Sequence, residues 1–189
     1  DVLTAKDAAI AVLAALQARR ATGHGSHVQP NLLSSLQGAL ANQGQAFLGA
    51  GVVPAGMGNA HPSIVPYQLL ECADGPLAVA CGNDAQFRRL ARELGAPDLA
   101  ADGRFTTNSA RVQHREVLVP LLEELLAAAP AERWQERLTG AGVPAGRVAG
   151  IDDGIAYAES LGLEPTIEVR DASGAVSGRQ MRHPAVWEP

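Results

Sequence analysis

The order of patterns along the sequence predicts an α+β fold, in which helices alternate with antiparallel hairpins. Helical patterns occupy most of the first fifty residues and recur at 84–95, 108–130 and 131–142. Two apolar runs, 67–72 and 77–82, flank an Asp-Gly pair, which is typical of a β-hairpin. Two further strand-like runs around a Ser-Gly turn close the sequence. Mixed short helices and hairpins of this kind indicate an α+β body.

Composition excludes several classes of function. Hydrophobic residues make up 47% of the 189 residues and aromatic residues only 4%, so Ala, Leu and Val must build the core. The formal charge of −5 and the absence of a Lys/Arg cluster argue against nucleic acid as a partner. No apolar run is long enough to span a membrane, and the first residues do not resemble a signal peptide. We therefore expect a cytoplasmic protein with no membrane partner.

The first part of the chain predicts two helices. The first is expected to begin with a capping box of Thr4 and Asp7, to carry an apolar face, and to end at Gly23. That face consists of Ala9, Val12, Leu13 and Leu16. The second is expected to cover 32–51 as one Ala-rich helix after Pro30. A glycine-containing loop, 49–66, then leads into the hairpin.

The predicted hairpin determines where the two cysteines lie. With Asp74-Gly75 as the two turn residues, Cys72 pairs with Leu77 and Cys81 pairs with Gln68. The two thiols are then separated by roughly 13 Å along the strands, too far for a disulfide. We expect both cysteines to be free and to act as small buried hydrophobes.

The later helices carry polar residues that the pattern assigns to caps or to solvent. Asp84 is the expected N-cap of the helix that ends at Gly95. Pro120 should kink or split the long helix 108–130. His114 lies among charged neighbours, which indicates a solvated face: Arg111, Arg115 and Glu116. A strand in 143–150 and a helix in 151–162 are expected to follow.

No motif alone assigns a chemistry. The run "TGHGSH" resembles a phosphate loop, but it follows a helix, so a helix cap and turn is the better interpretation. His24 and His27 lack a Cys or carboxylate partner in sequence, so we expect no metal site. The sequence has no G-x-S-x-G elbow for a serine nucleophile.

Six segments taken together resemble the family III CoA-transferases. In order, they are "VLAALQARRATGHG", "GNAHPSIVPYQ", "DGPLAVACGND", "RLARELG", "DGRFTTNSARVQHR" and "AGVPAGRV". The resemblance implies the second half of such an enzyme, of the CaiB/BaiF and formyl-CoA transferase type. It assigns 1–55 to helices of the large Rossmann-like domain, 56–150 to the small α+β domain and 151–189 to a return segment. Both ends then look cut, and the fragment alone is expected to be inactive.

The same resemblance implies a reaction and its residues. Asp1 falls at the position of the family's aspartate, which forms an anhydride and then a thioester while CoA moves from an acyl-CoA to a carboxylic acid. A loop that lies over this aspartate corresponds to Gly58, Asn59, Ala60, His61 and Pro62. CoA acts as a substrate, no cofactor is permanently bound, and the CoA-binding residues stay unassigned. An interlocked homodimer is expected.

Two other hypotheses remain open. An α-methylacyl-CoA racemase has the same fold, but the wording "GNAHPSIVPYQ" favours a transferase. The other hypothesis is a non-catalytic fragment or interaction module.

Overall fold

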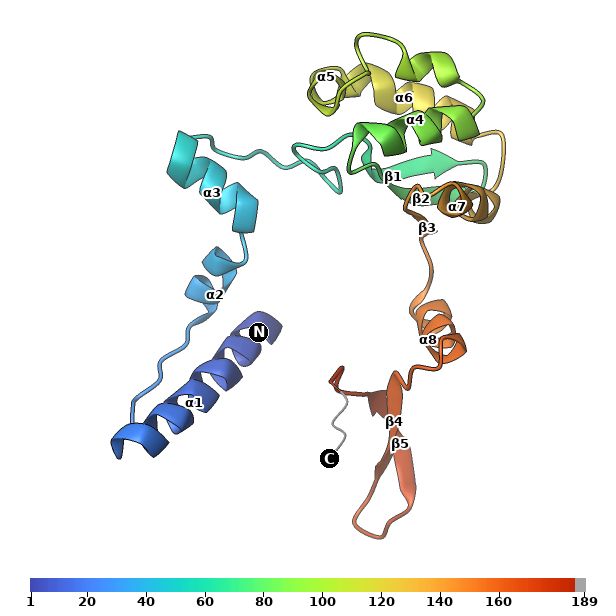
Figure 1. Ribbon diagram of the computed structural model, residues 1–189. Coiled ribbons are helices and arrows are strands. Elements are labelled where there is room, and N and C mark those ends of the chain that lie inside the picture. Colours follow the sequence, from blue (N-terminus) through green and yellow to red (C-terminus); the bar gives the residue numbers. More distant parts are fainter. Residues whose placement is uncertain (186–189) are drawn as a thin grey trace. The chain divides into compact units, whose positions relative to one another are not determined.

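A computed structural model describes residues 1–185, and residues 186–189 at the end of the expected return segment lie outside the description. The chain divides into two compact units, Asp1–Gly56 and Met57–Pro189, each described by itself below (Figure 1). Helices and two small antiparallel sheets make up the described residues, so the α+β prediction is confirmed.

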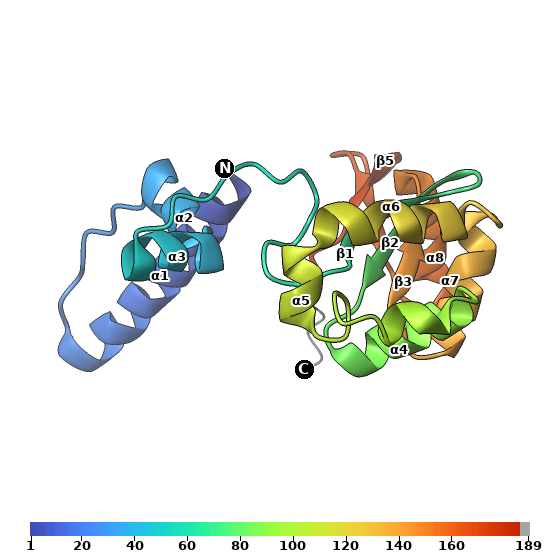
Figure 2. The same cartoon turned by 90° about the horizontal axis from the view of Figure 1, so that it is seen from above.

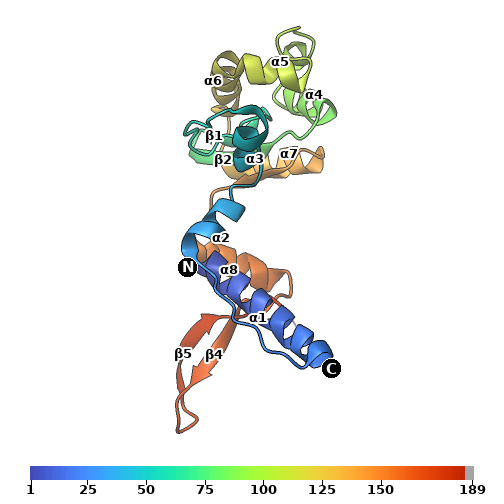
Figure 3. The same cartoon turned by 90° about the vertical axis from the view of Figure 1, so that its left-hand side faces the viewer.

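The first unit consists of three helices, α1 (Val2–Thr22), α2 (Leu32–Gly38) and α3 (Ala41–Ala50). The first helix ends as predicted, because Gly23 follows it at φ 76° in the left-handed region. The second begins at Asn31, whose side chain accepts a hydrogen bond from the Ser34 N–H at 2.9 Å. Figure 3 shows α2 beside α1, and the two helices are in contact.

The structure corrects two expectations in this unit. Thr4 does not begin α1, because the helix already starts after Asp1 and the Ala5 N–H donates to the Asp1 carbonyl at 2.8 Å. The expected helix 32–51 is broken between α2 and α3, where Ala41 has a positive φ of 46°. The apolar face of α1 is exposed, and the half-buried positions of this helix are Thr4, Ala8, Ala11 and Ala15.

The second unit is built on a three-stranded antiparallel sheet, β1 (Tyr67–Cys72), β2 (Gly75–Ala80) and β3 (Ala145–Arg147), with β2 in the centre. The hairpin is confirmed, but its register differs from the prediction by two residues. Cys72 lies opposite Gly75, so the turn consists of Ala73 and Asp74. The Asp74 carboxylate binds the start of α7, where it accepts the Ala131 N–H at 2.7 Å.

Helices pack on the inward face of this sheet. They are α4 (Asp84–Glu93), the 3-10 turn Pro97–Ala100, α5 (Asn108–Gln113), α6 (Arg115–Leu126) and α7 (Ala131–Gly140). Figure 2 shows α6 lying over β1 and β2. The core joins strand residues to helix residues in one cluster, with Leu70, Leu77, Phe87, Leu118, Leu122, Trp134 and Leu138 among its members.

Two helix predictions in this unit need correction. The N-cap of α4 is Asn83, which accepts from the Gln86 N–H at 2.9 Å, and Asp84 is the first helical residue. The expected helix 108–130 is broken at His114, the boundary between α5 and α6, while Pro120 lies inside α6. Gly95 ends its helix as predicted, at φ 78°.

The remaining elements are α8 (Ile151–Ser160), β4 (Thr166–Arg170) and β5 (Val176–Met181). The predicted helix and the closing pair of strands are confirmed, with Ser173 and Gly174 in the connection. Within residues 1–185, no helix has both the length and the apolar character needed to cross a membrane.

Candidate functional site

Asp1, the expected acyl carrier, occupies the N-cap position of α1. It is exposed, and its carboxylate makes no capping hydrogen bond to the first turn of the helix. Most aspartates at this position bind the N–H groups of the first turn. The carboxylate of Asp1 is therefore free of that interaction, beside the positive end of the helix dipole.

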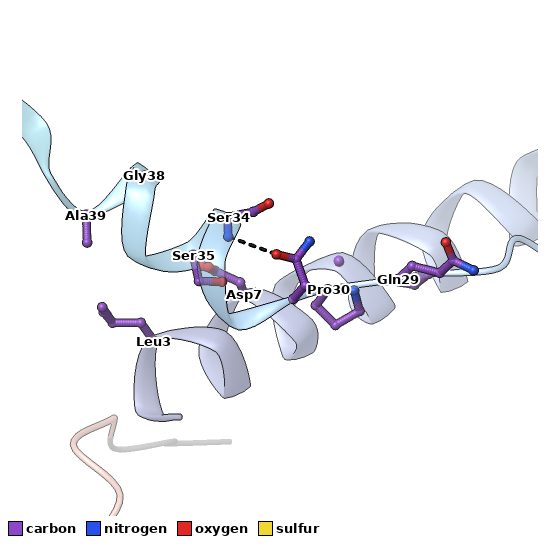
Figure 4. Close-up of a pocket in the computed structure, with 11 residues that line it drawn as sticks. Leu3, Asp7, Gln29, Pro30, Ser34, Ser35, Gly38 and Ala39 are labelled. Carbon is purple, nitrogen blue, oxygen red and sulfur yellow. Dashed lines mark hydrogen bonds between the residues drawn. The ribbon is translucent and has the colours of Figure 1, made fainter. Parts of the chain in front are cut away.

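A hollow of about 660 Å³ lies between α1 and α2 in the same unit (Figure 4). Leu3, Asp7 and Ala11 line it from α1, and residues 28–31 together with the start of α2 line the other side. The Asn31 side chain that caps α2 forms part of this wall. The hollow thus adjoins the first turns of the helix that begins at Asp1, and Asp7 is the one carboxylate in its lining.

The 58–62 loop belongs to the second unit, where it follows the free edge of the sheet. Gly58 takes φ 60°, which suits glycine, and a Cβ there would meet nothing within 4 Å. The Asn59 Oδ1 accepts the Leu69 N–H at 2.9 Å, and the His61 N–H donates to the Tyr67 carbonyl at 2.9 Å. Because β1 is an edge strand, these groups have no strand partner on that side. The loop satisfies them and is fixed in place.

The His61 side chain is held on both sides. Its ring stacks on the Tyr67 ring, with centroids 5.1 Å apart and an interplanar angle of 11°. Its Nδ1 accepts the Ser63 N–H at 3.1 Å. A ring nitrogen that accepts an N–H carries no proton, so the neutral ring has its proton on Nε2.

Three side chains from α5 and α6 hold the end of the loop and the residues that follow it, 61–65, and we call Asn108, Arg111 and Arg115 the loop clamp. The Asn108 Nδ2 donates to the Ser63 carbonyl at 2.8 Å, and its Oδ1 accepts the Val65 N–H at 3.2 Å. The Arg111 Nε donates to the Val65 carbonyl at 2.7 Å. One Arg115 nitrogen donates to two successive loop carbonyls at 3.1 Å, those of His61 and Pro62.

The loop clamp contradicts the solvated face expected around His114. Arg111 is 0% exposed, donates to the Phe105 carbonyl at 3.0 Å and to Asp84 at 2.9 Å, and stacks over the Phe87 ring at 4.4 Å. Sequence reasoning missed the clamp. The spacing of residues 108, 111 and 115, at i, i+3 and i+7, would place them on one face of the continuous helix that the sequence predicts, although the structure divides this helix at His114.

The outer face of the sheet borders the loop. A hollow of about 400 Å³ lies on it, with Asn59 and Tyr67 in its lining. The other lining residues come from the three strands and include the small side chains of Ala78, Ala80, Ala145 and Gly146. The loop and this small-residue surface therefore form one continuous region.

The cysteines do not form a reactive thiol site, and no metal site is found among the described residues. Both cysteines are free, as expected. Burial, then the nearby Asp74 and Glu71, raises the pKa of Cys72 to about 11, and burial raises the pKa of Cys81 to about 12. A thiol that stays protonated is a poor nucleophile. Within the described part of the chain, no group of three or more His, Cys, Asp or Glu side chains is arranged to hold a metal ion.

Comparison with known proteins shows the family to which this chain belongs. Residues 1–188 match CoA-transferase family III. The chain is 38% identical to the succinate–glutarate CoA-transferase of Agrobacterium fabrum over 92% of its length, and 35% identical to the acetyl-CoA:oxalate CoA-transferase of Acetobacter aceti over 71%. It is 33% identical to the human succinyl-CoA:glutarate CoA-transferase over 78% of its length. The chain belongs to CoA-transferase family III.

Solved structures agree with this assignment. A crystal structure of a CAIB/BAIF family protein from Brucella suis has a TM-score of 0.77 and 38% identity, and covers 98% of this chain. A crystal structure of Rv3272 from M. tuberculosis has a TM-score of 0.78 and 27% identity over 95%. The chain spans less than half of these proteins: 44%, 35% and 34% of the three relatives, and 47% and 46% of the two structures.

Proposed function

We propose that the protein containing this chain moves CoA from an acyl-CoA to a carboxylic acid, and that the acid that receives CoA is dicarboxylic. Membership of CoA-transferase family III is the observation that carries the proposal. The relatives described above act, by their names, on succinate, glutarate or oxalate, which are dicarboxylic acids, and one of these relatives also acts on acetyl-CoA, the thioester of a monocarboxylic acid. The same names do not favour an α-methylacyl-CoA racemase.

Asp1 is the nucleophile of this proposal. Its carboxylate attacks the thioester carbonyl of the acyl-CoA, so that a mixed anhydride forms and CoA thiolate leaves. The thiolate then attacks the aspartyl carbonyl of the anhydride, which gives an aspartyl-CoA thioester and releases the first acid. The second acid attacks this thioester to form a new anhydride and free the thiolate. Attack of the thiolate on the new acyl carbonyl yields the product and restores Asp1.

The 58–62 loop protects these intermediates. An anhydride hydrolyses readily, so the site must keep water away while the acids exchange. The loop suits this role because Gly58 adds no side chain and the edge strand and the loop clamp hold it firmly. We assign the helices of 1–55 to the large domain, 56–150 to the small domain and 151–189 to the return segment.

The complete enzyme is proposed to be a cytoplasmic homodimer with interlocked chains. Helices α1, α2 and α3 contain no buried residue, and apolar side chains such as Leu13 and Leu33 are more than half exposed. Large exposed apolar surfaces mark places that another chain or segment covers. The free cysteines fit a reducing compartment.

Trapping the aspartyl intermediate tests the nucleophile. The complete wild-type enzyme, incubated with succinyl-CoA and hydroxylamine, should carry a hydroxamate on Asp1 that mass spectrometry locates. Asp1→Asn should form no adduct and show negligible transfer, because the amide cannot form the anhydride. Asp7→Asn is the matched control on the same helix and should still form the adduct.

Three outcomes would contradict the proposal. Full activity in Asp1→Asn would exclude Asp1, and a hydroxamate on Asp7 would move the nucleophile one helical turn or more. Racemisation of an α-methylacyl-CoA without any adduct would establish the racemase instead. The chain 1–189 by itself is expected to form no adduct.

A further inference from the structure

We draw no further inference here: the strongest candidate, the hollow of about 400 Å³ that small and apolar side chains line on the outer face of the sheet of β1, β2 and β3, carries none because nothing among the described residues shows what covers it.

Discussion

Arg111 is a buried cation that connects three segments of the second unit. Its nitrogens donate to Val65 before β1, to Phe105 before α5 and to Asp84 at the start of α4. Removing a charged group from water costs several kcal/mol unless its hydrogen bonds are satisfied. Three donors and the Phe87 ring provide that compensation here. One residue therefore holds the end of the loop against the core.

Replacing this residue should weaken the fold. Arg111→Met leaves the Val65 and Phe105 carbonyls without their buried donors, and each such loss costs about 1–3 kcal/mol. We expect the free energy of unfolding, measured by urea titration of residues 57–149, to fall by about 3 kcal/mol. The exposed Arg88→Met is the control and should change it by less than about 0.5 kcal/mol. Equal effects of the two substitutions would show that the buried hydrogen bonds add nothing to stability.

The two thiols should react slowly and in a pH-dependent way. Because the pKa of Cys72 is raised to about 11 and that of Cys81 to about 12, little thiolate exists at pH 8 in the folded state. Alkylation by iodoacetamide at pH 8 should be about 100-fold slower in the folded protein than in urea. Comparable rates in the two states would contradict the raised pKa values.

The raised pKa values of the two cysteines also determine how the free energy of unfolding changes with pH. The folded protein keeps both thiols protonated above pH 9, where the unfolded chain already ionises. The stability that the neutral thiols contribute is thus complete below pH 9 and is lost as pH rises toward 11 and 12. Serine at both positions should reduce this loss.

At the scale of elements, the hairpin turn shows that contacts with a helix can override the turn position that the Asp-Gly pair prefers. Asp-Gly favours the two central positions of a tight turn. Here Ala73 and Asp74 take those positions. The Ala73 N–H donates to the carbonyl of Ala129, just before α7, at 3.2 Å, and the Asp74 carboxylate accepts the N–H of Ala131, the first residue of α7. Gly75, at φ 139°, begins β2 instead. The register is therefore set by the contact with α7.

A substitution in the 58–62 loop can distinguish an effect on function from an effect on stability. Gly58→Leu forces a side chain into the left-handed region, which costs about 1–2 kcal/mol, and adds bulk to the loop that is proposed to shield the intermediates. We expect turnover per folded molecule to fall at least about 10-fold, beyond what the melting temperature explains. Gly95→Leu is matched, since Gly95 has φ 78° and equally open space. It should lower the melting temperature and leave turnover unchanged. Unchanged turnover in Gly58→Leu would limit the loop to a structural role.

At the scale of the whole chain, burial is confined to one region. Among the described residues, all fully buried side chains lie between Val65 and Val143. The three helices of the first unit bury none. Isolated helices of this kind are marginal in water, because most helical stability in proteins comes from packing.

This distribution predicts which parts fold alone. Residues 57–149 should give a cooperative urea transition and a native circular-dichroism spectrum, because their core is complete. Residues 1–56 should be largely unfolded or should aggregate until the rest of the enzyme covers them. A cooperative transition in 1–56, or none in 57–149, would contradict the burial pattern.

The sequence alone was sufficient for features that depend on neighbours in the chain. Helix ends at Gly23 and Gly95, the hairpin itself and the α+β class follow from local backbone preferences and hydrophobic periodicity. The family resemblance also came from short segments in order. It named Asp1 and the 58–62 loop, whose roles remain predictions.

Only the tertiary structure decided features that depend on distant partners. Asn108 binds Ser63 across 45 positions and Arg115 binds His61 across 54, separations that no local pattern reveals. The hairpin register and the burial of Arg111 were mispredicted for the same reason, since each depends on a surface that another element supplies. Local conformational preferences differ between residues by about 1 kcal/mol or less, whereas burying a charge and satisfying its hydrogen bonds involves several kcal/mol. Tertiary packing therefore decided the structure where it conflicted with a local preference.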